Sequence, residues 1–196
     1  MQFRDVIRRR RMVRAFKDRP LARDVVDRIL NNAIRAPSAG FSQGWAFLVL
    51  EGRDQTEEFW TAIAHGTPHH EHVYDAPLIV VCLSHKDAYL DRYTQPDKGW
   101  TDRDEARWPA PYWDIDTGFA ALLMLLTAVD EGLGGLFLGI VPERMDAFRS
   151  AFDVPSAYKP IGAVAVGYVK SGERATGSAL TLRRRPLEEV VHRGRW

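Results

Sequence analysis

Two arginine-rich segments near the ends of the chain carry the residues best suited to bind an anion. Arg8 to Arg11 form a run of four followed by Arg14, and Arg183 to Arg185 form a second run. Planar guanidinium groups pair with phosphate oxygens, so both segments could serve one phosphate-bearing ligand. A solvated face or a nucleic-acid patch is the other interpretation of such runs. Because no wider basic surface follows the first run, we favour an anion site at Arg10, Arg11 and Arg14.

A second candidate is the loop of small and hydrogen-bonding residues between Pro37 and Gly44, which leads into a short apolar strand at Ala46 to Leu50. Pro37 disfavours helical geometry at Ala36, so the preceding helix should end there. Gly40 and Gly44 can adopt positive φ and let another molecule approach the backbone closely. A plain connection between a helix and a strand is the alternative interpretation. The arginines at both chain ends favour a binding loop, because they could serve the same ligand.

Histidines and a cysteine raise two further hypotheses. The histidines are His65, His69, His70 and His72, and imidazole is a common zinc ligand. Their spacing matches none of the familiar ligand pairs, so we expect a solvated loop without metal and keep metal binding as the alternative. The single cysteine, Cys82, lies in an apolar run and has no partner cysteine, so core packing is its expected role.

An aromatic stretch without clear periodicity runs from Tyr93 to Trp113. Its rings are those of Tyr93, Trp100, Trp108, Tyr112 and Trp113. About twenty residues without regular structure are uncommon in a compact domain unless they are functional or disordered, and the tryptophans argue against disorder. We expect a lid-like insertion or pocket wall at 93–113, with packing on the core or on a partner subunit as the alternative.

The composition is that of an ordinary globular protein. The 196 residues are 45% hydrophobic and 27% charged, with a net charge of +1, so the charge balance implies neither nucleic acid nor an acidic membrane as a partner. One cysteine indicates a reducing compartment, and the N-terminus carries no apolar targeting segment. We expect a soluble, cytoplasmic protein with one domain over residues 1–196.

Hydrophobic periodicity predicts the elements that must position these residues. We expect helices at 2–11, 23–35, 54–63, 114–131 and 142–152, and strands at 46–50, 78–83, 136–140 and 161–169. Asp54 to Glu57 resembles a capping box. The helix at 114–131 is apolar around nearly its whole circumference, so it should be central or at an interface. The predicted fold class is α/β (α+β), with a mixed central sheet of about four to five strands flanked by helices and a polar tail at 170–196.

Two motifs resemble those of the FMN-dependent nitroreductase family. Residues 10–16, Arg-Arg-Met-Val-Arg-Ala-Phe, resemble its flavin-phosphate motif, usually Arg-Arg-Ser-Val-Arg-x-Phe. Residues 36–45, Ala-Pro-Ser-Ala-Gly-Phe-Ser-Gln-Gly-Trp, resemble its Ala-Pro-Ser-Ala-Gly-Asn-x-Gln-Pro-Trp loop. Residues 132–134 and 183–187 follow in the family's order. The resemblance covers nearly the whole chain and implies a nitroreductase-like fold with a helix-rich dimer interface.

The resemblance assigns the arginines to the phosphate and the ring of FMN. Arg10 and Arg11 would hold the phosphate and the ribityl chain, and Arg183 and Arg185 would return to the phosphate. Arg14 would lie near N1 and O2 of the isoalloxazine. Reduction develops negative charge there, and a fixed guanidinium would stabilise it.

The other residues implied at the cofactor come from the loop and from a strand end. The loop would wrap the flavin from the partner subunit, and backbone groups after the strand that follows Gly132 would approach the flavin N5. The implied cofactor-binding residues besides the arginines are Met12, Pro37, Ser38, Ala39, Gly40, Gln43, Leu138 and Gly139.

Three residues depart from the family's motifs. Met12 stands where the family usually has Ser, which removes a hydroxyl able to bond the phosphate. Phe41 stands in place of Asn, and Gly44 in place of Pro. The two loop changes alter polar contacts and stiffness, so they bear on substrate preference more than on flavin binding.

The resemblance implies an FMN-dependent NAD(P)H oxidoreductase, a homodimer with two flavins at its interface. NADH or NADPH would reduce FMN and leave, and a small aromatic, quinone or nitro-type acceptor would then take the electrons in a ping-pong mechanism. The cofactor supplies the chemistry, so we nominate no catalytic residue. A non-catalytic flavin- or nucleotide-binding protein is one alternative. A dehalogenase, an oxidase or a flavin-fragmenting enzyme of the same superfamily is another.

Overall fold

The computed structural model describes residues 1–64, 71–174 and 178–196. Its strands are β1 (Trp45–Glu51), β2 (Leu78–Ser84), β3 (Gly134–Leu138) and β4 (Lys159–Gly167). They form one sheet in the order β1-β2-β4-β3, and every neighbouring pair is antiparallel. Within the described residues, the parallel pairing is an isolated bridge between Met12 and Gly135, at the edge of the sheet formed by β3. The predicted α+β fold class with about four strands is confirmed.

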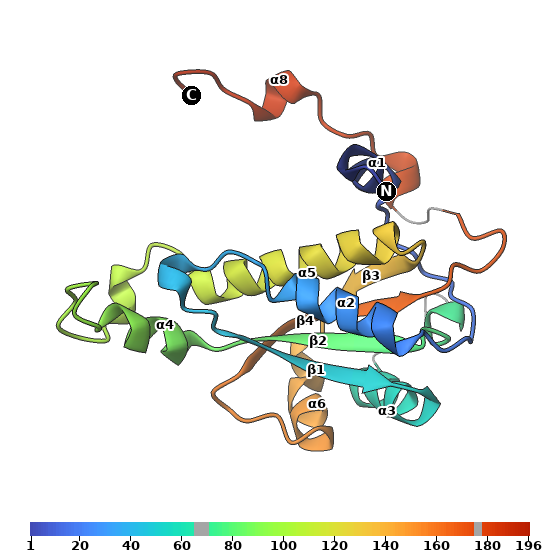
Figure 1. Ribbon diagram of the computed structural model, residues 1–196, viewed down its shortest axis with the longest axis horizontal. Coiled ribbons are helices and arrows are strands. Elements are labelled where there is room, and N and C mark those ends of the chain that lie inside the picture. The colour runs from blue at the N-terminus through green and yellow to red at the C-terminus, as the bar shows by residue number, and fades with distance from the viewer. Residues whose placement is uncertain (65–70, 175–177) are drawn as a thin grey trace.

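Helices cover both faces of this sheet (Figure 1). The described α-helices are α1 (Phe3–Arg9), α2 (Arg23–Ala33), α3 (Arg53–Ile63), α4 (Lys86–Tyr93), α5 (Tyr112–Asp130), α6 (Met145–Ala151), α7 (Ser178–Thr181) and α8 (Leu187–Val190). α2 and α5 pack together on one face, and α3 and α6 pack together on the other (Figure 1). α1 packs on α5, whereas α8 lies in the C-terminal tail away from the sheet (Figure 1).

β2 runs through the middle of both cores. All of its residues are buried, as its continuous apolar run predicted. Leu78, Val80 and Cys82 pack with α2 and α5, and the residues between them pack with α3 and α6, because successive side chains of a strand face opposite sides. Burial raises the pKa of Cys82 to about 12, which agrees with a packing role for this thiol.

The predicted capping box of α3 is wrong. The helix starts one residue earlier, its N-cap is Gly52 at φ 80°, and no side chain caps this end. Asp54 therefore already lies inside the helix. Glu57 pairs with Arg53 on the helix surface instead of reaching back to a cap.

β3 and β4 both begin two residues before their predicted starts. Gly132 adopts φ 75° and ends α5, as predicted, so the chain enters the sheet as early as Gly134. Gly135 also belongs to the strand, because α5 packs closely over it: a Cβ on Gly135 would lie 2.8 Å from Leu125. The strand accordingly ends at Leu138.

α5 is the central helix that its apolar sequence predicted, and it packs on β2, β3 and β4. Among the described helices it alone is long and apolar enough to cross a membrane, but half of that apolar window is buried inside the protein. Phe119 and Leu122 remain exposed on α5, by 43% and 45%. Phe3 on the neighbouring α1 is also exposed, so an apolar surface lies on this side of the molecule.

Candidate functional site

The segment that carries the first arginines extends the sheet at its β3 edge. Met12 bridges Gly135, and the Val13 N–H donates to the Gly135 carbonyl at 3.0 Å. Further along, the Lys17 N–H donates to the Tyr168 carbonyl at 2.8 Å. These backbone bonds hold the arginine segment, residues 10–17, between β3 and the chain that follows β4.

The arginines of this segment differ in their partners. Arg11 pairs with Glu173, whose side chain is only 4% exposed, and the second oxygen of Glu173 accepts the backbone N–H of Arg14 at 3.2 Å. Arg10 and Arg14 are half-buried, and neither guanidinium forms an ion pair with a residue that the structure describes. Arg10 and Arg14 therefore remain available to an anion, whereas an acid holds Arg11 in place. Sequence reasoning did not single out Glu173.

The side chain of Met12 belongs to the core. It packs against both core clusters, and its sulfur accepts the N–H of Phe137 at 3.4 Å. The change from the family's serine thus exchanges a hydroxyl for apolar packing.

The loop from Ser38 to Gly44 is tight and strained. Gly40, Phe41 and Gln43 have φ values of 61°, 57° and 50°, in the left-handed region that favours glycine. The Ser38 Oγ atom accepts the Gln43 N–H at 3.0 Å and closes the loop from within. Phe41 and Gln43 are exposed on its outer side.

A buried carboxylate from α5 holds the inner side of this loop. The Oδ2 atom of Asp116 accepts the Ala39 N–H at 2.9 Å and the Tyr89 hydroxyl at 2.8 Å. Burial, and then the neighbouring Asp116 carboxylate, raise the pKa of Tyr89, so its hydroxyl stays a donor. The Arg92 Nε atom donates to the Gly40 carbonyl at 2.8 Å. The sequence offered no signal that separates Asp116 from Asp114, a second acid near the start of the same helix.

Tyr89 explains why the loop ends in glycine where the family's motif has proline. A Cβ on Gly44 would collide with the Tyr89 ring and would lie 2.8 Å from the His85 carbonyl oxygen. Neither alanine nor proline fits while Tyr89 occupies this place. Gly44 and Tyr89 are therefore sterically matched.

The aromatic stretch packs behind the same loop. The ring centroid of Trp108 lies 5.9 Å from that of Tyr89, 4.5 Å from that of Tyr93 and 5.4 Å from that of Trp100. Tyr93 in turn lies under Gly40, where a Cβ would come within 2.7 Å of its ring. The first and last rings of the stretch belong to α4 and α5, and the remainder includes a short 3-10 helix.

The arginine segment and the loop lie near opposite ends of α5 (Figure 1). The loop is bonded to Asp116 near the start of α5, whereas Gly135, which bridges the arginine segment, follows its end. At 1.5 Å per residue, Asp116 and Asp130 are about 21 Å apart along the helix. The two regions also lie at opposite edges of the sheet, because the loop leads into β1. One chain by itself does not bring these groups of predicted residues together.

The other predicted residues divide between the sheet edge and the tail. Leu138 and Gly139 lie at the end of β3, on the edge that carries the arginine segment, and a Cβ on Gly139 would meet no described atom within 4 Å. Arg183 and Arg185 lie in the exposed tail, which runs away from the sheet (Figure 1). Arg185 pairs with Glu189 of the same tail. No bond between these two arginines and the arginine segment is present in the described part of the chain.

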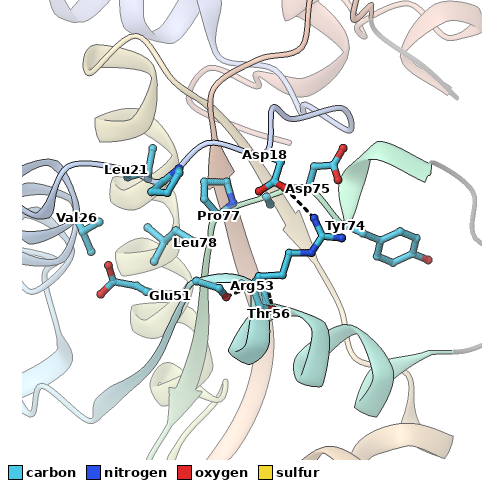
Figure 2. A pocket seen from close by; sticks show the side chains of 13 residues that line it. Asp18, Leu21, Val26, Glu51, Arg53, Thr56, Tyr74, Asp75, Pro77 and Leu78 are labelled. Atoms are coloured by element: carbon cyan, nitrogen blue, oxygen red, sulfur yellow. Dashed lines mark hydrogen bonds and ion pairs between the residues drawn. The ribbon is translucent and has the colours of Figure 1, made fainter.

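One cavity of about 170 Å³ lies beside the start of α3 (Figure 2). Leu21, Val26 and Leu78 form its apolar wall, and the Arg53 side chain reaches toward Asp18, 2.9 Å away (Figure 2). The residues that line it include none of those predicted at the flavin. It is also smaller than the cavities of about 300 Å³ and more that enclose drug-sized ligands.

The metal hypothesis rests mainly on His65, His69 and His70, which lie outside the described residues. His72 is described: its Nδ1 atom lies 3.1 Å from an Asp75 oxygen and 2.9 Å from the Lys170 ammonium. Among the residues that the structure covers, no three histidine, cysteine or acidic side chains group as a metal site.

Comparison with known families identifies the chain. The sequence profile of the Nitroreductase family matches residues 7–168, which include both the arginine segment and the loop. The chain belongs to the nitroreductase family. An Archaeoglobus fulgidus protein with the provisional name NADH dehydrogenase/NAD(P)H nitroreductase is 30% identical over 165 residues, 82% of each chain. A Staphylococcus aureus NADPH-dependent oxidoreductase is 24% identical over 196 residues, 98% of this chain and 73% of its own.

Solved structures of nitroreductases share the fold. A nitroreductase family protein of Clostridium difficile aligns with a TM-score of 0.74 and 24% identity over all of both chains. An FMN-dependent nitroreductase of the same species aligns with a TM-score of 0.71 and 20% identity over 97% and 98% of the two chains. The predicted nitroreductase fold is confirmed, and the nitroreductase described here is an oxidoreductase enzyme.

Proposed function

We propose that this nitroreductase is an FMN-dependent NAD(P)H oxidoreductase that reduces a small aromatic, quinone or nitro-type acceptor. The observation that carries the proposal is the pair of half-buried residues Arg10 and Arg14, whose guanidiniums lack an acidic partner among the described residues. Arg11 lies between them in the chain, so three guanidiniums share one sheet edge. Such a group suits a phosphate. The FMN-dependent neighbour and the relatives named for NAD(P)H add support.

The residues at the β3 edge fit FMN by their chemistry. Arg10 and Arg11 would hold the phosphate and the ribityl chain, and the Arg14 guanidinium would stabilise negative charge at the N1–O2 edge of the ring. The backbone of Leu138 and Gly139 would face the flavin N5, and the space around Gly139 leaves room for a ligand. When bound, FMN would supply the redox chemistry, which is hydride acceptance from NADH or NADPH and electron transfer to the acceptor in a separate half-reaction.

We also infer that the active form is a homodimer. The arginine segment and the loop lie near opposite ends of α5, so a second copy of the chain would supply the loop that one arginine segment lacks. A groove of about 380 Å³ between α1 and α5 is lined by Phe3 and Leu126, and Phe119 and Leu122 are exposed nearby. Covering this apolar surface with a second copy would remove it from water. The tail extends from the body of its own chain and would carry Arg183 and its neighbours to the partner.

Two further proposals concern the aromatic stretch and the chain as a whole. We propose that the aromatic stretch at 93–113 walls the acceptor side of the flavin from behind the loop. We propose further that residues 1–196 act as one FMN-binding unit in the cytoplasm, in keeping with the single buried cysteine.

Anaerobic addition of NADPH to the purified protein tests the proposal. We expect chromatography of the extracted cofactor to give FMN, the flavin absorption band to bleach with NADPH or NADH, and the band to return with a quinone. Recovery of FAD alone, or of no flavin after reconstitution, contradicts the assignment. FMN that neither nucleotide reduces would favour the non-catalytic flavin-binding alternative. Light scattering tests the dimer, and a monomer that holds FMN tightly would contradict a shared site.

A further inference from the structure

We propose that Asp116 and Tyr89 are positioning residues that hold the loop from Ser38 to Gly44 in the form that faces the flavin ring. The proposal rests on the FMN-dependent function above. Both residues lie outside the two motifs, on helices that pack behind the loop. They act through the Ala39 backbone N–H and through the space beside Gly44.

The placement of Asp116 shows what its carboxylate does. It is only 3% exposed, and a buried carboxylate is costly unless hydrogen bonds or a cation compensate it. Its Oδ2 atom accepts from Ala39 and from Tyr89, and no cation pairs with it among the residues described. A hydrogen bond from an N–H to a carboxylate is roughly twice as strong as one between neutral groups. Asp116 is therefore a stronger anchor for the Ala39 amide than a backbone carbonyl would be.

The loop needs such an anchor because its backbone is strained. Phe41 and Gln43 have positive φ although neither is glycine, and a strained backbone persists only where surrounding contacts determine it. The hydrogen bonds to Asp116 and from Arg92 hold the inner side of the loop, while Phe41 is 75% exposed on the outer side. An outer face held in this way is pre-organised for a ligand, because it does not have to be ordered on binding.

Tyr89 joins the anchor to the aromatic stretch. Its hydroxyl donates to Asp116, its ring leaves no room for a side chain at Gly44, and Trp108 packs against its edge. Loss of the hydroxyl alone, in Tyr89→Phe, keeps the packing and removes one bond to the carboxylate. Loss of the carboxylate, in Asp116→Ala, removes the anchor itself. The two variants therefore weaken the same anchor of the loop to different degrees.

Amide hydrogen exchange of the unliganded protein tests the anchor without any cofactor. We expect Asp116→Ala to speed exchange of the peptide 38–44 by about tenfold to hundredfold, the factor that a hydrogen bond to a charged group is worth. Asp116→Asn keeps an acceptor, so it should have a smaller effect, and Tyr89→Phe the smallest. The matched control is Asp130→Asn, the same change at the exposed end of α5, which should leave the peptide unchanged.

Unchanged exchange in all three test variants would overturn the anchor. Exchange of the β2 peptide, expected to be unaltered, shows that each variant is folded. Should Asp116→Ala fail to fold, the graded effects of Asp116→Asn and Tyr89→Phe decide the question.

Binding of FMN and of riboflavin separates a flavin role from a purely structural one. The two ligands differ only in the phosphate, and the loop is proposed to face the ring. Asp116→Asn should therefore weaken both by the same factor, whereas Arg10→Ala, a change at the proposed phosphate contact, should weaken FMN alone. A faster-exchanging loop with unaltered affinity for both flavins would overturn the positioning role. Wild-type protein that binds neither flavin would overturn the proposed function, and with it the flavin role of the loop, while the exchange result would still decide the anchor.

Discussion

The arginine segment and the loop from Ser38 to Gly44 prepare for a ligand in opposite ways. The arginine segment is extended, is held by backbone bonds to β3, and leaves two guanidiniums without an acidic partner among the described residues. The loop has positive φ at three positions and is held by side chains: a buried carboxylate, a serine and an arginine. One region offers charge from a relaxed backbone, and the other offers shape from a strained one.

This difference indicates where each region tolerates change. Charge acts over several ångströms, so the arginine segment depends on which ionic groups are present and on how Glu173 holds Arg11. Shape depends on close packing, so the loop depends on Tyr89 and on the missing side chain at Gly44. Substitutions that change charge should therefore affect the arginine segment most, and substitutions that change packing should affect the loop most.

The largest effect is expected at the pair of Arg11 and Glu173. Arg11→Ala leaves a nearly buried carboxylate without its cation, so the free energy of unfolding should fall by about 2–3 kcal/mol, less than for a fully buried pair because Arg11 is partly exposed. Adding Glu173→Gln should restore most of this loss, since a neutral amide is cheaper to bury. Urea unfolding of the single and double variants measures both. Equal losses in the two would mean that the unpaired Glu173 carboxylate is not the cause of the loss.

Arg10→Ala should weaken FMN binding by about 1.5–3 kcal/mol, the usual worth of a hydrogen bond to a charged group, and leave riboflavin binding unchanged. Arg10→Lys should recover only part of the loss, because an ammonium lacks the paired geometry. Arg23→Ala, at an exposed arginine outside the site, is the control. Flavin fluorescence titrations measure both ligands. An equal loss for FMN and riboflavin would place Arg10 away from the phosphate.

High pH should destabilise the region beneath the loop. The folded protein raises the pKa of Tyr89, so above pH of about 10 the unfolded chain loses this proton while the folded chain keeps it. The free energy of unfolding should then fall by about 1.4 kcal/mol per pH unit from this group. Tyr89→Phe lacks the group, so its stability should fall less steeply over the same range. Parallel curves for wild type and Tyr89→Phe would show that Tyr89 is not held protonated.

The smallest effect is expected at Phe41, which has φ 57° where the family's motif has asparagine. Asparagine tolerates the left-handed region better than a bulky residue, so Phe41→Asn should raise the free energy of unfolding by up to about 1 kcal/mol. Phe41→Ala shortens the side chain without offering the local hydrogen bonds of asparagine, and it serves as the control. Thermal unfolding measures both. A destabilised Phe41→Asn protein would mean that the ring itself makes contacts that outweigh the strain.

Local rules predicted much of the fold because they depend on neighbours in the chain. The continuous apolar run of β2 and the all-round apolar α5 were both identified from the sequence, and Gly132 was correctly named as the end of α5. The capping box at Asp54 failed because Gly52 could start the helix one residue earlier. The start of β3 was missed because the consecutive glycines 134 and 135 look like a turn until α5 is packed over Gly135. The start of β4 was missed because Lys159 and Pro160 join the strand by pairing with the end of β2, which the apolar pattern does not show.

The sequence by itself determined which residues carry charge, which loop can adopt positive φ, and which family the motifs resemble. Only the tertiary structure decided which residues far apart in the chain are in contact. Glu173 reaches Arg11, and Asp116 reaches Ala39, across 162 and 77 positions of the chain. Periodicity and spacing carry no information about such long-range contacts, because these depend on how the helices pack on the sheet. The same packing set the loop and the arginine segment near opposite ends of α5, and it is this separation that makes a second chain part of the proposed site.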